Sequence, residues 1–141
     1  MRYVLDASVA LSWIIPRPLS PKALLLRDQY RHQIHHLIAP SVYPHEIANA
    51  LTKSERQKLI PVGDARPLSR DVLSTAPILY RTGPIYWRAI DISSQTRTGF
   101  YDCLYVALAE SEGIELITAD DKLIKNLQTR FPFVISLANL P

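Results

Sequence analysis

Short runs of apolar residues recur along the chain, and polar or proline-containing turns separate them. These runs are rich in β-branched and aromatic residues, and short runs of this kind between turn-forming residues are typical of buried β-strands. They predict strands over residues 2–6, 36–40, 77–81, 113–118 and 133–137.

The stretches between these runs are longer, and their apolar positions recur every three or four residues. That spacing is typical of amphipathic helices, and prolines fall near several of their ends. Pro16 and Pro18 stop the first helix, whereas Pro44 opens the third. The pattern predicts helices over residues 7–15, 20–35, 44–59, part of 61–75, 84–96, 100–113 and 120–131.

Strands that alternate with helices predict an α/β fold with a mostly parallel sheet. No linker or repeat divides the chain, so we expect a single domain over residues 1–141. In such sheets ligands bind at the carboxyl ends of the strands. Side chains that follow the strands are therefore the first candidates for function.

Composition narrows the choice of protein class. The chain is 48% hydrophobic and 21% charged, and no apolar run is long enough to cross a bilayer. An aspartate interrupts the first apolar stretch, so we expect no signal peptide and no membrane. The single cysteine, Cys103, excludes an intrachain disulfide and a thiolate metal site, and favours a cytoplasmic protein. A net charge of +3 points weakly toward an anionic partner such as nucleic acid.

Acidic residues recur where predicted strands meet predicted helices. Each is at a loop or in a first helical turn, so all are expected at one edge of the sheet. Asp102 is the most unusual, because the helix around it is almost entirely apolar and an unpaired buried carboxylate is costly. The four residues are Asp6, Glu46, Asp102 and Asp120.

Each acid also has an ordinary structural explanation. Asp6 could cap the helix that follows it, and Glu46 and Asp102 could interact with helix dipoles. Thr118 could cap the next helix together with Asp121. Capping alone would accept Ser, Thr or Asn equally well, so the repeated acid favours a functional site.

Clustered carboxylates repel one another. Two unit charges about 4 Å apart cost roughly 4 kcal/mol at an effective dielectric constant near 20. Either protons or a divalent cation must compensate them, and an all-oxygen ligand set favours Mg²⁺ or Mn²⁺. His32 and His36 have the spacing to share a helix face and bind a metal, but a solvated polar face explains them better because no third ligand is apparent.

Four motifs, in this order, resemble the PIN-domain ribonucleases, and within them the VapC-like toxins of prokaryotic toxin–antitoxin pairs. The resemblance covers essentially the whole chain. The motifs are "VLDAS" with Asp6 and Ser8, "PHEIANAL" with Glu46 and Asn49, "YDCLYVALAE" with Asp102, and "LITADDKL" with Thr118 and Asp120.

The resemblance implies a three-layer α/β/α sandwich and a cytoplasmic endoribonuclease that uses Mg²⁺ or Mn²⁺. It also implies a homodimer and an antitoxin protein whose tail reaches the acidic site. Asp6, Glu46, Asp102 and Asp120 would be the catalytic, metal-binding acids. The supporting residues would be Ser8, Asn49 and Thr118, and Asp121 could share or replace the role of Asp120.

Basic and aromatic residues near the acids are candidates for contacts with RNA. Arg97, in the loop before Asp102, is the leading candidate for a substrate contact, whereas a solvated helix face is favoured for Lys53, Arg56 and Lys122. Tyr101 and Tyr105 could stack on bases, although tyrosines in such a helix are more often core residues.

Two other classes of protein compete with the nuclease. One is a Mg²⁺-dependent phosphoryl-handling domain, either a phosphoaspartate receiver or a haloacid-dehalogenase-like phosphatase. The phosphatases have an aspartate where this chain has Ser8, and receivers have paired early acids, so both are disfavoured. The other is a non-catalytic module that holds RNA or a protein on the same fold.

Overall fold

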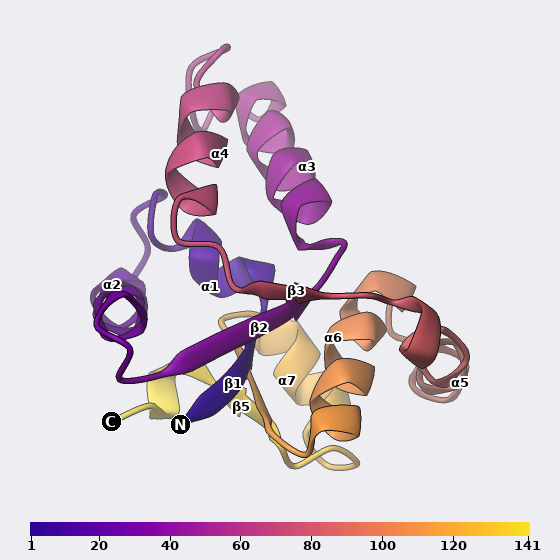
Figure 1. Ribbon diagram of the computed structural model, residues 1–141. Coiled ribbons are helices and arrows are strands. Elements are labelled where there is room, and N and C mark those ends of the chain that lie inside the picture. The colour runs from indigo at the N-terminus through magenta and orange to yellow at the C-terminus, as the bar shows by residue number, and fades with distance from the viewer.

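A computed structural model describes all 141 residues, and its centre is a five-stranded sheet. All four strand pairings are parallel, and the order across the sheet is β3-β2-β1-β4-β5 (Figure 1). The expected α/β class is thereby confirmed, and the sheet is parallel throughout. The strands are β1 (Arg2–Leu5), β2 (His36–Pro40), β3 (Ile78–Tyr80), β4 (Glu115–Thr118) and β5 (Val134–Ser136).

Helices cover both faces of the sheet, as expected for a three-layer sandwich. Parallel strands require crossover connections, which are almost always right-handed. The chain moves from β1 to β3 across one half of the sheet, then returns to β4 and β5, so the two sets of helices lie on opposite faces (Figure 1). The first set is α1 (Ala7–Leu11), α2 (Ser20–Arg31), α3 (Tyr43–Arg56) and α4 (Ala65–Leu73); the second is α5 (Tyr86–Thr96), α6 (Phe100–Glu112) and α7 (Asp121–Leu127).

The central element of the second layer is α6. It packs on β1, β2 and β4 and lies beside α5, and every residue from Cys103 to Ala109 is buried. It ends where Gly113 adopts a left-handed conformation with a φ of 65°. Only glycine adopts that conformation without a steric cost, so the chain can turn directly into β4.

The pair formed by α3 and α4 extends away from the sheet (Figure 1). Arg27 of α2 supports the end of α4 that lies nearer the sheet. The Arg27 side chain is buried, donates to the backbone and side-chain oxygens of Asp71 at 2.7 and 2.9 Å, and lies over the Trp13 ring. Trp13 therefore belongs to the core, whereas Leu24 and Leu25 on α2 are exposed.

The helices predicted over residues 44–59 and 120–131 end at Arg56 and Leu127, and the first two helices of the chain also end early. The first ends at Leu11 rather than residue 15, because the backbone hydrogen bonds of Ser12 and Trp13 change to the tighter three-residue spacing. The second ends at Arg31 rather than residue 35, because Gln33 adopts a left-handed φ of 59°. Neither position carries the glycine that usually marks such a helix end.

The early end of α2 rules out the alternative metal site at the two histidines. His32 caps the C-terminus of α2, whereas His36 begins β2, so the two residues share no helix face. None of the helices has both the length and the apolar character required to cross a bilayer.

The packing of α6 on the sheet predicts a large cost for a cavity beneath it. Leu104 is 1% exposed, so Leu104→Ala should lower the free energy of unfolding by about 2–5 kcal/mol, measured by chemical denaturation. Val62→Ala, between α3 and α4, is the control, because Val62 is 89% exposed and its loss should change stability by less than about 0.5 kcal/mol. Equal effects of the two substitutions would contradict this assignment of the core.

Candidate active site

The sheet contains one point where the strand order reverses. β1 has β2 on one side and β4 on the other, and the connections that leave β1 and arrive at β4 lie on opposite faces. A crevice opens at the carboxyl ends of the strands at such a point. Asp6 directly follows β1 there, and Thr118 ends β4.

Asp6 is the most buried of the four acids, with 6% of the residue exposed. The hydroxyls of Ser8 and Thr118 both donate to its Oδ2, the latter at 2.8 Å, while Oδ1 receives no side-chain hydrogen bond. Burial raises the pKa of Asp6, the two hydroxyls lower it, and the nearby charge of Asp120 raises it further. The hydroxyls hold the carboxylate in place but do not offset its desolvation.

The same hydroxyls also fix the backbone that leads to Asp120. The amide of Ala119 donates to Ser8 Oγ at 3.0 Å, and the amide of Asp120 donates to Thr118 Oγ1 at 3.0 Å. The cap of α7 is Asp120 itself, which accepts from the amides of Lys122 and Leu123. The predicted capping role of Thr118 is therefore wrong, because its hydroxyl is turned toward Asp6 instead.

Glu46 and Asp102 come from the first turns of α3 and α6. Burial, with the charge of Asp6 added, raises the pKa of Glu46 to about 7 and that of Asp102 to about 6. The Oε1 atom of Glu46 is buried without a hydrogen-bond partner. The hydroxyl of Tyr105 is also buried and makes no hydrogen bond.

One cavity of about 390 Å³ brings all four acids together. The four acids therefore lie together at one edge of the sheet, as expected. Asn49 and Lys53 also line this acid cavity, one and two turns along α3 from Glu46. Sequence reasoning favoured a solvated face for Lys53, although its helical spacing from Glu46 already placed both residues on one side of α3. The complete lining is Asp6, Ala7, Ser8, Leu11, Glu46, Asn49, Ala50, Lys53, Asp102 and Asp120.

A second cavity of about 270 Å³ adjoins the first, and its lining combines two basic residues with two of the acids. It shares Asp102 and Asp120 with the acid cavity and adds Arg97, Lys122 and Asn126. We call it the cationic pocket. Arg97 ends α5 in a left-handed conformation, with a φ of 59°, and that turn directs the chain toward Asp102.

Two other candidate residues lie elsewhere. Asp121 is exposed in the first turn of α7 and lines neither cavity, so the geometry favours Asp120 as the acid of this strand end. The Cys103 thiol is buried on α6, and burial raises its pKa to about 11. A thiol in that state is a poor nucleophile.

The residues of the acid cavity fit a hard divalent cation in their donor chemistry. The donors are all oxygens, one of them is a buried Glu46 oxygen without a partner, and three of the carboxylates have raised pKa values. No three acidic, histidine or cysteine side chains stand at the spacing of a preformed metal site. The fit to a divalent cation therefore rests on the oxygen donors and on the cavity that they share.

The fold and site define a class of protein: a parallel α/β domain with a carboxylate cavity where the strand order reverses. The family model described as PIN domain matches residues 3–127. The chain belongs to the PIN domain family. Membership in this family excludes the receiver and dehalogenase-like folds. Among curated proteins, no sequence matches the chain.

Solved structures with the same fold are distant in sequence. PAE2754 from Pyrobaculum aerophilum is 22% identical, with a TM-score of 0.72 over 98% of this chain and 85% of that one. A toxin–antitoxin complex from Klebsiella pneumoniae is 15% identical, with a TM-score of 0.61 over 96% and 97% of the two chains. VapBC2 from Rickettsia felis, bound to a DNA fragment from its promoter, is 19% identical, with a TM-score of 0.62 and the same coverage.

The raised pKa values predict how stability depends on pH. In the absence of divalent cations, the folded chain holds protons on Glu46 and Asp102 up to pH values near 7 and 6, above the ordinary values of 4.5 and 3.8. The folded state then binds more protons than the unfolded state, so the free energy of unfolding should fall as pH rises through this window. Chemical denaturation at a series of pH values measures the slope.

A variant separates this effect from the titration of other groups. Glu46→Gln should make the pH dependence less steep between about pH 4.5 and pH 7, whereas Glu115→Gln, outside the cavity at the start of β4, should leave it unchanged. An unaltered slope in Glu46→Gln would show that Glu46 is not held protonated by its surroundings.

Proposed function

We propose that this protein is a metal-dependent endoribonuclease that hydrolyses RNA phosphodiester bonds, and that it is the toxin of a toxin–antitoxin pair. The observation that carries the proposal is the gathering of Asp6, Glu46, Asp102 and Asp120 around one cavity in a chain of the PIN family. Binding alone does not require four clustered carboxylates, because they repel a phosphate backbone unless a cation compensates them.

The toxin assignment draws on the solved structures of the same fold. Two of the three are toxin–antitoxin complexes, one from Klebsiella pneumoniae and one, VapBC2, from Rickettsia felis. We therefore propose that this chain also binds an antitoxin protein and, as the family resemblance implies, forms a homodimer. Leu24 and Leu25 supply exposed apolar surface on α2 for such contacts.

In the proposed mechanism, Asp6, Glu46, Asp102 and Asp120 hold Mg²⁺ or Mn²⁺. When bound, the cation supplies Lewis-acid chemistry that activates water and neutralises charge on the phosphate oxygens. Ser8 and Thr118 hold the Asp6 carboxylate through their hydrogen bonds and so fix its direction. No side-chain nucleophile is needed.

In this proposal, basic side chains around the cavity bind the RNA. Lys53 lines the acid cavity itself, while Arg97 and Lys122 line the cationic pocket beside Asp102 and Asp120. Phosphate contacts of this kind position a nucleic acid without reading its sequence. We propose that Arg97 and Lys122 bind a phosphate next to the one that is cleaved.

Removal of a proposed metal ligand should abolish cleavage without unfolding the chain. Asp6→Asn and Asp102→Asn keep the size of each side chain but remove its charge, so RNA cleavage should fall at least about a hundredfold. A gel assay of a labelled RNA with Mg²⁺ or Mn²⁺ measures the rate, and circular dichroism checks the fold. Asp91→Asn, an exposed acid on α5, is the matched control.

Removal of the cation tests the same proposal independently of mutation. EDTA should stop cleavage, and added Mn²⁺ should raise the melting temperature of the unaltered chain more than that of Asp102→Asn. Cleavage that survives chelation would overturn the metal-dependent mechanism. RNA binding without cleavage in any divalent ion, in protein free of bound inhibitor, would favour the non-catalytic module.

Loss of the Arg97 charge should weaken RNA binding in a salt-dependent way. Arg97→Asn removes the charge yet tolerates the left-handed backbone, so the slope of log affinity against log salt should fall by about one. Lys58→Asn is the matched control: Lys58 is also basic and exposed, has a φ of 60°, and lies outside both cavities. Equal slopes for the two variants would exclude a specific phosphate contact at Arg97.

A further inference from the structure

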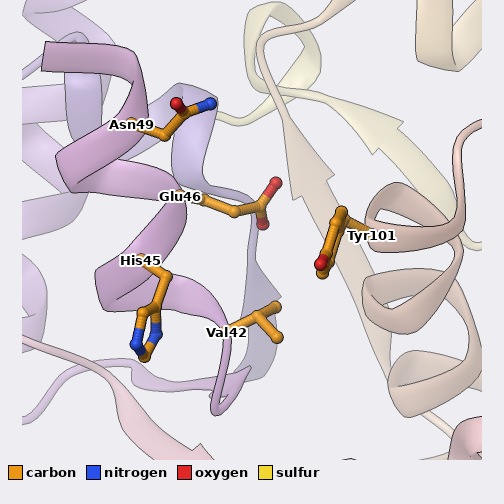
Figure 2. A pocket seen from close by; sticks show the side chains of 5 residues that line it. All are labelled: Val42, His45, Glu46, Asn49 and Tyr101. Atoms are coloured by element: carbon orange, nitrogen blue, oxygen red, sulfur yellow. The ribbon is translucent and has the colours of Figure 1, made fainter. Parts of the chain in front are cut away.

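A third cavity, of about 470 Å³, adjoins the acid cavity on the side away from Arg97. Figure 2 shows it as a gap between the first turns of α3 and α6, with Tyr101 on one side and Val42 and Glu46 on the other. We call it the tyrosine pocket. Its lining is Val42, His45, Glu46, Asn49 and Tyr101.

Helical geometry explains why four residues of this lining lie together on the α3 side. Positions 42, 45, 46 and 49 are three, four and seven residues apart, so they form one continuous stripe along the helix. Glu46 and Asn49 belong to both the tyrosine pocket and the acid cavity. The two cavities therefore adjoin at these two side chains.

Tyr101, which forms the opposite wall of the pocket, is not part of the hydrophobic core. Tyr101 is 58% exposed, whereas Tyr105, one turn further along α6, is fully buried. Tyr101 makes an edge contact with Phe100 at 5.8 Å between ring centroids. In Figure 2 the ring stands across the gap from Val42 and Glu46, at the mouth of the pocket.

We propose that the tyrosine pocket binds one unpaired nucleobase of a single-stranded RNA, stacked on Tyr101, while the adjoining phosphate lies in the acid cavity. This inference rests on the proposed nuclease function and assigns one subsite for its RNA substrate. The flat ring of Tyr101 and the apolar side chain of Val42 suit a planar group between them. His45 and Asn49, on the same stripe, offer hydrogen-bond donors and acceptors to the edge of the base.

The charges on the two sides of the acid cavity give the bound strand its path. The tyrosine pocket contains the carboxylate of Glu46 and no lysine or arginine, so it favours a base over a phosphate. The cationic pocket contains Arg97 and Lys122 and suits a phosphate. In a duplex the base faces are covered by stacking and the edges by pairing, so only an unpaired nucleotide can enter the tyrosine pocket.

The test measures binding of a short single-stranded RNA that the unaltered chain cleaves, together with copies in which each base in turn is replaced by an abasic ribose. The Asp6→Asn background keeps the RNA intact. One abasic position beside the cleavage site should weaken binding about tenfold when Tyr101 is present. Tyr101→Ala should weaken binding of the intact RNA about tenfold and remove the effect of that position.

Two further variants separate stacking from a structural effect. Tyr101→Phe keeps the ring and should preserve both the affinity and the sensitivity to the abasic position. Trp87→Ala is the matched control: Trp87 is an exposed aromatic residue on α5 that lines none of the three cavities, and its loss should change affinity less than about twofold.

The possible results distinguish this inference from the proposed function. Absence of RNA cleavage by the unaltered chain would overturn both. Two results would overturn the nucleobase site alone, provided that the unaltered chain cleaves RNA. One is that Tyr101→Ala binds RNA as tightly as the unaltered chain, and the other is that no abasic position weakens binding more than the rest. Loss of self-association in Tyr101→Ala by analytical ultracentrifugation, with RNA affinity intact, would assign the pocket to a second copy and also overturn the inference.

Discussion

Asp6 lies at the carboxyl end of the central strand, almost out of contact with solvent, and two hydroxyls donate to one of its oxygens. One belongs to Ser8, close by in the sequence, and the other to the distant Thr118. Those hydrogen bonds position the carboxylate but do not fully offset its desolvation, so its pKa stays raised, and its charge raises the pKa of both Glu46 and Asp102. The local structure around the cavity is organised about this one buried acid. Ser8 and Thr118 also hold the backbone that presents Asp120.

Three adjoining cavities differ in the groups they present. The acid cavity shares Glu46 with the tyrosine pocket and Asp102 with the cationic pocket. The tyrosine pocket is lined by aromatic and polar groups, the acid cavity contains all four carboxylates, and the cationic pocket is lined by two basic residues beside two of the acids. The bases and phosphates of the proposed RNA substrate would match this order.

Most of the element order follows from the hydrophobic pattern, because buried parallel strands are apolar throughout and surface helices are apolar along one face. Some local backbone conformations do not follow from that pattern. Gln33 and Arg97 adopt left-handed conformations that sequence favours only weakly outside glycine and asparagine. The resulting early end of α2 separates His32 from His36, and the turn at Arg97 brings a cation to the edge of the site.

The sequence by itself determined the α/β class, the family resemblance and the acids at the strand ends, because each depends on spacing along the chain. Only the tertiary structure decided which neighbours these acids have. It turned the Thr118 hydroxyl to Asp6 rather than to a helix cap, placed Asp121 outside the cavities, and buried Tyr105 while exposing Tyr101. Hydrogen bonding and burial join residues more than a hundred positions apart, and no local pattern encodes that proximity.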